Sequence, residues 1–214
     1  MKIAAVMPIK LNNERLPGKN TKLLGDKPLL RYELDSLLET ARVDDISVFC
    51  SDESVCRFLP EGVSFLRRDE RLDLPSSNFT QIFDSFQSLK KADVYVYAHA
   101  TAPFVSVGTM RELIDAVTSG CYDSAFCAVK IQDFLWQDGK PLNFDAANLP
   151  RSQDLQPIYR ETSGVYVFTR EVFKTHRRRV GLNPLVKEVT FRESVDVNTP
   201  EDFALAEAML KVNL

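Results

Sequence analysis

The sequence predicts an α/β fold in which a mostly parallel, twisted sheet carries helices on both faces. Short apolar segments that suit buried strands alternate along the chain with longer segments whose apolar residues have helical spacing. Residues 94–98 form an almost unbroken β-prone run, as expected of a central strand covered on both faces. The first strand leads into a basic, turn-rich segment, and sheets of this class bind ligands at the carboxyl ends of their strands.

Length and composition indicate one ordinary globular domain spanning residues 1–214. The chain has 214 residues, of which 44% are hydrophobic and 27% charged, and no linker or repeat marks a second domain. Its formal net charge of −3 argues against a nucleic-acid partner bound by bulk electrostatics. No apolar run approaches the roughly twenty residues of a membrane helix, and no signal peptide is apparent. Four cysteines without zinc-type spacing suit reduced thiols, so we expect a cytoplasmic protein without a membrane partner.

The first half of the chain alternates strands and helices. Asp52 and Glu53 suit the first turn of a short helix, where the helix dipole favours acids, and residues 76–78 resemble a helix N-cap region. The predicted strands are residues 3–6, 46–50, 63–66 and 94–98. The predicted helices are residues 28–40, 54–59, 79–89 and 109–117.

The second half is less regular. Residues 132–156 are polar and rich in helix and strand breakers, so we expect a small β excursion there around the turn Asp138-Gly139. Thr199 and Pro200 mark the start of the last helix, as N-cap and first helical residue. The predicted strands and extended pieces are residues 124–129, 134–136, 140–144, 165–169, 184–187 and 194–197, and a short helix starts at 170.

The segment from residue 7 to residue 27 is the strongest candidate for a binding loop. It carries five cations against two acids, together with glycines and asparagines that permit tight turns. Cations that converge with free backbone N–H groups make a cradle for phosphate oxygens. The loop matches neither a Walker A motif nor a dinucleotide-binding glycine fingerprint, and a solvated lysine-rich loop is the alternative. The cations are Lys10, Arg15, Lys19, Lys22 and Lys27.

The order of residues in this loop carries a family resemblance. Pro8 and Lys10 follow the strand, then come the runs RLPGKN from Arg15 and LLGDKPLL from Leu23. This order resembles the opening signature of the sugar cytidylyltransferases, which couple CTP to acidic sugars such as sialic acid or Kdo. The chain is most similar to the acylneuraminate (CMP-sialic acid synthetase) type, related to CMP-Kdo synthetase. The resemblance implies a Rossmann-like, GT-A-like nucleotidyltransferase fold with a small β excursion.

The resemblance also implies residue roles on the nucleotide side. The family carries an arginine where Lys10 stands, whereas Glu14 departs from its pattern. Asp196-Val197-Asn198 resembles a D-x-D ending whose two aspartates bind Mg²⁺, and Asn198 offers a weaker ligand; a plain helix cap at Thr199 is the alternative. The implied catalytic residues are Lys10, Arg15, Lys19 and Asp196, and the implied metal ligands are Asp196 and Asn198. The implied nucleotide-binding residues are Pro8, Lys10, Asn12, Arg15, Lys19, Asn20, Arg68 and Asn78.

On the acceptor side, the run HATAPF from His99 resembles a family passage in which a glutamine contacts the sugar. His99 replaces that glutamine and could serve as a general base. The runs RSQD from Arg151 and YRETSGVY from Tyr159 resemble the acid-sugar recognition segment, where an arginine fork suits a carboxylate. The implied substrate-binding residues are His99, Thr101, Arg151, Gln153, Arg160, Thr162 and Tyr166.

The activity implied is transfer of a cytidylyl group from CTP to an acidic sugar, giving a CMP-sugar and pyrophosphate for surface glycan synthesis. The resemblance further implies Mg²⁺ as cofactor and a homodimer in which residues 132–160 serve dimerisation and the sugar pocket. Two alternatives stay open. The departures from the family at Glu14, His99, Val105 and Asn198 leave room for a nucleotide-binding homologue without transfer activity. Because the most altered positions are those expected to face the acceptor, a nucleotidyltransferase acting on another sugar or a polyol is the second alternative.

Overall fold

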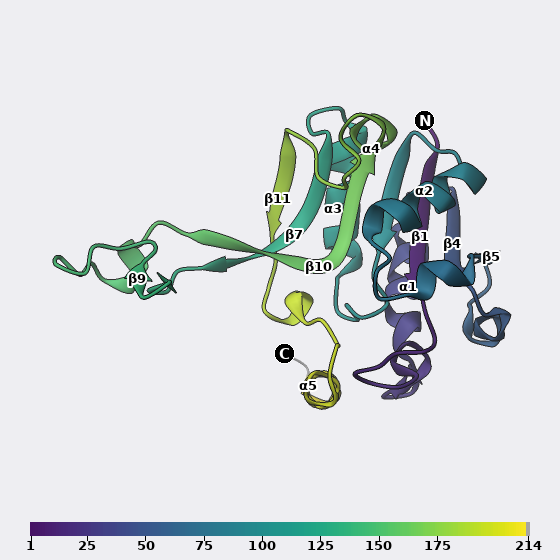
Figure 1. The fold of residues 1–214 in the computed structure, drawn as a ribbon, viewed down its shortest axis with the longest axis horizontal. Coiled ribbons are helices and arrows are strands. Elements are labelled where there is room, and N and C mark those ends of the chain that lie inside the picture. The colour runs from purple at the N-terminus through teal and green to yellow at the C-terminus, as the bar shows by residue number, and fades with distance from the viewer. Residues whose placement is uncertain (213–214) are drawn as a thin grey trace.

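The computed structural model describes residues 1–212, so residues 213 and 214, the end of the predicted domain, lie outside the described residues. A seven-stranded sheet forms its centre in the order β11-β7-β10-β6-β1-β4-β5 (Figure 1). Neighbouring strands run parallel except at β10, which is antiparallel to both β6 and β7. The strands are β1 (Ile3–Ile9), β4 (Asp45–Cys50), β5 (Val63–Arg67), β6 (Val94–Ala98), β7 (Ser124–Ile131), β10 (Ile158–Thr169) and β11 (Pro184–Glu188).

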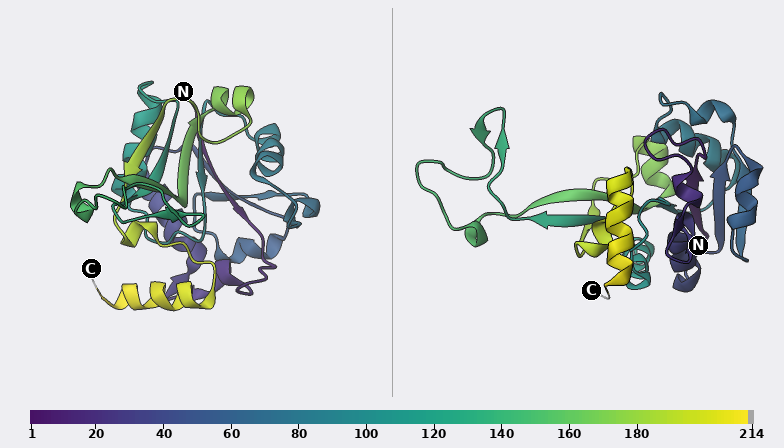
Figure 2. Two further views of the ribbon diagram at one scale, coloured as in Figure 1. Left: turned by 60° about the vertical axis from the view of Figure 1, so that its left-hand side comes forward. Right: turned by 90° about the horizontal axis from the view of Figure 1, so that it is seen from below.

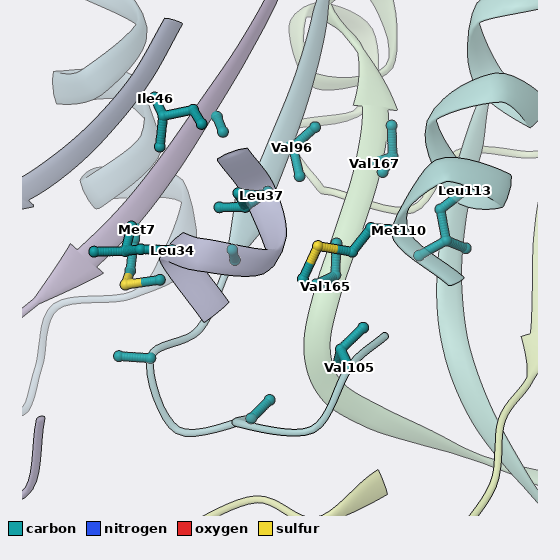
Figure 3. Packing of buried hydrophobic residues seen from close by; sticks show 14 of the residues in the cluster. Met7, Leu34, Leu37, Ile46, Val96, Val105, Met110, Leu113, Val165 and Val167 are labelled. Atoms are coloured by element: carbon teal, nitrogen blue, oxygen red, sulfur yellow. The ribbon is translucent and has the colours of Figure 1, made fainter. Parts of the chain in front are cut away.

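Helices cover both faces of this sheet, which confirms the predicted fold class. On one face, α1 and α3 pack against the apolar side chains of β1, β4 and β6 (Figure 3). On the other face, α2 and α4 enclose a second core rich in aromatic rings. The helices are α1 (Leu29–Thr40), α2 (Phe79–Leu89), α3 (Val107–Thr118), α4 (Arg170–His176) and α5 (Pro200–Lys211).

Strand β1 shows how the sequence fixes the two faces. Ala5, Met7 and Ile9 belong to the core under α1 and α3, whereas Ala4 and Val6 belong to the aromatic core. Successive side chains of a strand point to opposite faces, so a strand buried on both sides reads as a continuous apolar run. Burial on both faces therefore fixes the position of the carboxyl end of β1, where the basic loop begins.

The last helix holds that loop in place through a third apolar cluster. Leu16 of the loop and Leu24 of β2 (Leu23–Leu24) pack with Val197 and with Phe203 and Ala206 of α5. Helix α5 begins at the predicted cap, where Thr199 Oγ1 accepts a hydrogen bond from the Asp202 backbone N–H at 3.2 Å. The two-residue strand β3 (Lys27–Pro28) pairs with β2 and leads into α1. Residues 178 and 179 positions apart in the chain are thus brought into contact.

A long arm projects from the sheet. The outer ends of β7 and β10 pair with each other beyond the other strands and carry the segment between them away from the body of the molecule (Figures 1 and 2). The predicted β excursion is present but smaller than expected, with β8 (Trp136–Gln137) and β9 (Lys140–Pro141). Strand β10 begins at Ile158 rather than near residue 165, because pairing with β7 continues past a bulge between Glu161 and Tyr166.

Two short elements differ from the sequence prediction. The helix expected at residues 54–59 is a 3-10 helix, η2 (Glu53–Phe58), whose cap is Asp52 accepting from the Ser54 N–H at 2.8 Å. The extended piece expected at residues 194–197 starts as the 3-10 helix η5 (Arg192–Ser194). Both segments are short, and 3-10 helices occur mostly as short pieces of this kind. None of the helices within residues 1–212 has the length and apolar character needed to cross a membrane.

Candidate active site

The loop after β1, the segment after β6 and the segment before α5 meet around one cavity of about 420 Å³. It lies at the carboxyl ends of β1 and β6, where open α/β sheets bind ligands. Nine of the residues predicted for the site line it together, drawn from three distant parts of the chain: Pro8, Lys10, Arg15, Lys19, Asn20, His99, Thr101, Asp196 and Asn198.

The basic loop is ordered by its own backbone and by one asparagine. Gly18 adopts a left-handed conformation with φ of 64°, which turns the chain into the 3-10 helix η1 (Lys19–Thr21). Asn20 is buried, and its Nδ2 donates to the backbone carbonyl of Lys10 at 3.0 Å. This hydrogen bond joins residues 10 and 20 and so fixes the backbone that carries the cations between them.

Lys19 lies inside the protein rather than in a solvated loop. Its side chain is 9% exposed, and its Nζ donates to the Val197 carbonyl and to Asn198 Oδ1, both at 3.0 Å. Burial lowers the pKa of this ammonium, and the charge of Asp196 opposes that shift. Arg15 Nη2 donates to the same Asn198 Oδ1 at 2.9 Å. Two loop cations therefore converge on one amide oxygen beside the cavity.

Three buried oxygens around this cavity have no hydrogen-bond donor within the described part of the chain. They are Asn13 Oδ1, Asn20 Oδ1 and Asp196 Oδ1, and all three residues line the cavity. Buried acceptors are normally satisfied, so such oxygens suit a bound cation, a water or a ligand hydroxyl. No group of three or more His, Cys, Asp or Glu side chains within residues 1–212 could hold a metal ion alone. A divalent cation at Asp196 would therefore need further oxygens from a ligand.

His99 faces the cavity from the end of β6. Its Nδ1 lies 3.3 Å from the carbonyl oxygen of Gly164 on β10. Burial, together with the positive charge of Arg179, lowers the pKa of His99 to about 4. The imidazole is therefore neutral near pH 7, with its Nδ1–H donated to Gly164, which leaves the Nε2 lone pair free to accept a proton.

Gly164 lets the segment after β6 pack closely against β10, because it has no side chain. A Cβ atom at Gly164 would lie 2.9 Å from Val105 Cγ2 and 3.4 Å from Ala102 Cβ. The segment after β6 thus packs directly on the backbone of β10, and Ser163 of β10 joins the cavity lining. Sequence reasoning singled out neither Ser163 nor Asn13 as site residues.

A second cavity, of about 790 Å³, adjoins the first at Lys10. It lies between the basic loop and the ends of β4 and β5, and the predicted nucleotide residue Asn12 lines it. Glu14 lines it too, and it also lines a small cavity of about 210 Å³ beside Arg15 and Lys19. The remaining lining residues of the 790 Å³ cavity are Leu11, Ser51, Asp52, Glu53, Arg67, Glu70, Asp73, Leu74 and Pro75.

Two predicted nucleotide residues are not among the lining of these cavities. Arg68 is 4% exposed, and its Nη2 donates to the Ile9 carbonyl at 2.8 Å and to the Asp73 carboxylate. Arg68 therefore links the ends of β1 and β5 from within the protein and does not line either cavity. Asn78 caps α2, where its Oδ1 accepts from the Gln81 N–H at 3.1 Å in a capping box.

The predicted acid-recognition residues lie apart from the cavity of their own chain. Arg151 is exposed on the arm and pairs with Asp154 at 2.7 Å, while Gln153 and Arg160 are also exposed along the arm and β10. Thr162 is buried and donates to the Cys127 carbonyl at 3.1 Å. Tyr166 is buried in the aromatic core rather than lining a pocket. These five side chains do not line the cavity of their own chain, because the arm carries Arg151 and Gln153 outward and β10 directs the other three to its exposed end or into the core.

Arg179 is a further cation near His99 that sequence reasoning did not assign. Its guanidinium lies 3.6 Å from the ring centroid of Tyr166, and its Nη2 donates to Tyr166 Oη at 2.9 Å. It also pairs with Glu161 at 3.4 Å. The only signal in the sequence was a run of three arginines, residues 177–179, within which nothing distinguished this residue.

Comparison with known proteins gives a consistent family. A family model described as "Cytidylyltransferase" matches residues 4–213. N-acylneuraminate cytidylyltransferase from Oncorhynchus mykiss is 26% identical over 215 residues, covering 96% of this chain and 49% of that protein. CMP-N,N'-diacetyllegionaminic acid synthase from Legionella pneumophila is 24% identical, covering 100% of this chain and 98% of that protein. The chain thus spans about half the length of the first relative and nearly all of the second.

Solved structures agree on the fold. The structure of a CMP:2-keto-3-deoxy-manno-octonic acid synthetase complexed with CTP superposes with a TM-score of 0.75 at 17% identity, covering 100% of both chains. A 4-diphosphocytidyl-2C-methyl-D-erythritol synthase from Anaerococcus prevotii gives 0.67 at 13% identity, covering 99% of both chains. At these identities the likeness concerns the arrangement of the sheet and helices.

Proposed function

The chain belongs to the cytidylyltransferase family, and from this premise we propose that it transfers a cytidylyl group from CTP to an acidic sugar. One observation carries the proposal. Lys10, Arg15 and Lys19 converge with Asp196 around a single cavity at the carboxyl ends of β1 and β6. A set of cations beside a free carboxylate oxygen suits a polyphosphate that brings a divalent cation with it.

In the proposed reaction, a hydroxyl oxygen of the sugar attacks the α-phosphorus of CTP. A new oxygen–phosphorus bond forms, the bond to the bridging oxygen breaks, and pyrophosphate leaves with the electron pair. Phosphoryl and nucleotidyl transfer depend mainly on positioning and on neutralising charge. Arg15 and Lys19 would contact the leaving phosphates, and Lys10 stands between the two cavities. His99 Nε2 would accept the hydroxyl proton.

We propose Mg²⁺ as the cofactor. Asp196 Oδ1, buried without a donor, would hold it together with phosphate oxygens of the nucleotide. When bound, the cation supplies positive charge to the phosphate oxygens. Asn198 is less suited to be a ligand, because its Oδ1 already accepts hydrogen bonds from Arg15 and Lys19.

We also propose that the chain works as a homodimer in the cytoplasm, with the arm reaching a second copy. The arm carries exposed apolar side chains, of which Trp136 is 60% and Leu149 65% exposed. Exposed apolar groups on a projecting element favour contact with another protein surface. Arg151 would then meet the acceptor's carboxylate in the partner's site, a role compatible with its position on the arm outside the cavity of its own chain.

The test is a pyrophosphate-release screen of the four ribonucleoside triphosphates against acidic sugars, with neutral sugars and a polyol phosphate as further acceptors. We expect turnover with CTP and an acidic sugar, and loss of CTP affinity by roughly 1.5–3 kcal/mol in Lys19→Met, the scale of a charged hydrogen bond. Lys22→Ala is the matched control, because Lys22 is an exposed cation of the same loop. CTP binding without turnover for any acceptor would contradict the transferase, and turnover with the polyol phosphate alone would contradict the acidic acceptor.

A further inference from the structure

Asn198 connects two cations and two acids on the triphosphate side of the cavity: Arg15, Lys19, Asp196 and Asp202. Its Oδ1 accepts from Arg15 Nη2 at 2.9 Å and from Lys19 Nζ at 3.0 Å. Its Nδ2 donates to Asp196 Oδ2 at 2.6 Å. Its backbone N–H donates to Asp202 Oδ2 at 2.9 Å, which fixes it to the cap of α5. Both the amide oxygen and the amide nitrogen of the side chain are therefore held by hydrogen bonds, and the backbone of the residue is held as well.

The amide can serve these partners in only one orientation. An amide oxygen accepts hydrogen bonds, whereas an amide NH₂ group only donates them. A flipped side chain would turn the NH₂ group toward the Arg15 and Lys19 donors and the oxygen toward the Asp196 carboxylate. Both contacts would then be repulsive, so the charges of the three neighbours fix the orientation. Both lone pairs of Oδ1 are used, and the free oxygen of the cluster is Asp196 Oδ1.

A carboxylate in place of this amide would change the cluster in two ways. It would pair with Arg15 and Lys19 as an anion and so offset positive charge that a triphosphate would otherwise meet. It would also lose the N–H donor to Asp196 and bring two carboxylate oxygens to hydrogen-bond distance. Like charges at that separation in a partly buried site are unfavourable unless a cation lies between them. The neutral amide needs no cation to assemble the same geometry.

We propose that Asn198 is a positioning residue that presets Arg15 and Lys19 for the triphosphate before any metal is bound. The inference rests on the proposed function only in taking a triphosphate as the anion. It follows that polyphosphate binds to this chain without a divalent cation. An aspartate at this position would make that binding depend on the cation.

The experiment measures binding of inorganic tripolyphosphate and of CTP by calorimetry, in EDTA and in excess Mg²⁺. It uses the full chain and the variants Asn198→Asp and Asn198→Ala. Asn148→Asp is the matched control, because it makes the same charge change at an exposed position on the arm. Thermal unfolding of each variant reports whether it is folded at the temperature of the titration.

In EDTA, we expect Asn198→Asp to bind tripolyphosphate at least about tenfold more weakly than the parent, and excess Mg²⁺ to restore most of that loss. Asn198→Ala should bind more weakly in both conditions, because Arg15 loses its acceptor, Lys19 keeps only the Val197 carbonyl, and Mg²⁺ cannot replace the amide oxygen. Asn148→Asp should bind as the parent does.

Two results would overturn the inference: a parent that binds neither probe in EDTA, or equal metal-free affinities of the parent and Asn198→Asp. Tripolyphosphate carries neither base nor sugar, so its binding tests the positioning role apart from the reaction. Metal-free binding that Asn198→Asp abolishes would support the inference even if the pyrophosphate screen found no turnover. Turnover with a parent that binds polyphosphate only through Mg²⁺ would support the proposed function and refute the inference.

Discussion

His99 Nδ1 lies 3.3 Å from the Gly164 carbonyl oxygen, so the end of β6 and the middle of β10 share a hydrogen bond at the edge of the cavity. The same two residues are joined a second time, because the His99 backbone N–H donates to the Gly164 carbonyl at 3.0 Å. The ring therefore has a fixed tautomer and direction. A histidine held in this way is neutral over the range in which most enzymes are assayed, which gives a pH-dependent prediction.

We expect His99→Asn to lose less stability than the parent on acidification. The pKa of His99 is about 4 in the folded protein, whereas that of an unperturbed histidine, as in the unfolded chain, is 6.5. Between these values the unfolded chain takes up a proton that the folded chain does not, so unfolding becomes easier as the pH falls through 6.5 towards 4. The difference amounts to about 3 kcal/mol at most.

Urea unfolding of both proteins from pH 7.5 down to about pH 4 measures this effect. His176→Asn, at the other histidine of the chain, shows how much of the change follows from removing any histidine. A parent and His99→Asn with parallel stability curves would mean that His99 is not buried as a neutral ring.

Arg67, the last residue of β5, and Arg68, which follows it, should differ sharply in their contribution to folding stability. Arg68 has a side chain 3% exposed and pairs with Asp73, whereas the side chain of Arg67 is 60% exposed and pairs with Glu53 at 3.3 Å. Removing one member of a buried ion pair leaves the other charge uncompensated and costs about 3–5 kcal/mol. Removing a surface partner costs less than about 1 kcal/mol.

Arg68→Met and Arg67→Met should therefore separate in chemical denaturation, with a large loss only in the first. Double substitution of Arg68→Met with Asp73→Leu should recover much of the loss, because no buried charge is then left alone. If Arg68→Met instead left the unfolding free energy intact and weakened CTP binding alone, Arg68 would be a ligand and not a support.

The fold could be predicted because its strands and helices differ in period and length. The structure of residues 94–98 and the cap at Thr199 can be predicted from local sequence alone. Both elements lie where the sequence predicts them. The cavity lining was predicted by residue order, since the loop from Pro8 to Asn20 and the pair Asp196 and Asn198 fall on either side of one space.

The features that the sequence left unpredicted share a physical cause, because each depends on how segments pack against one another rather than on a local pattern. Lys19 is buried because α5 and Val197 cover the loop, which no local pattern in the loop reveals. Arg68 is buried because Asp73 folds back from a 3-10 helix, η3 (Glu70–Asp73), to meet it. Arg151 lies far from the cavity because the pairing of β7 and β10 sets the direction of the arm.

The arm permits a test of the proposed homodimer by subunit mixing. Arg151→Ala damages the arm and leaves Asp196 intact, whereas Asp196→Ala damages the cavity and leaves the arm intact. If the arm of one copy completes the site of the other, a mixed dimer of the two inactive variants contains one complete site. Co-expression should then restore CMP-sugar formation well above the sum of the separate variants.

Lys19→Met replaces Arg151→Ala in the control mixture, because Lys19 and Asp196 line the same cavity and no copy in that mixture has an intact cavity. A mixture of Arg151→Ala and Asp196→Ala with no recovered activity would place Arg151 outside the partner's site. A mass measurement by light scattering that found only single chains would contradict the dimer itself.

Glu33 makes the last prediction, because its carboxyl is buried without a partner. It lies on the core side of α1 with 0% of its surface exposed, and neither Oε1 nor Oε2 has a hydrogen-bond donor among residues 1–212. Burial raises the pKa of Glu33 well above its usual value, so the folded protein holds the protonated, neutral acid. The unfolded chain releases that proton once the pH passes about 4.3. Folding stability should therefore fall as the pH rises from there towards the pKa of the folded state, by about 1.4 kcal/mol per pH unit for this one group.

Glu33→Leu should remove this slope and raise the unfolding free energy most at alkaline pH, because an apolar side chain of similar length needs no proton and no donor. Glu33→Gln should remove the slope as well but gain less, because its amide stays buried without partners. Glu39→Gln is the matched control, an exposed glutamate on the same helix that should leave the slope unchanged. Unfolding free energies from guanidinium titrations between pH 5 and pH 9 would decide. A parent whose stability does not change over that range relative to Glu33→Leu would show that the carboxyl finds water or a partner and is not held as a neutral acid.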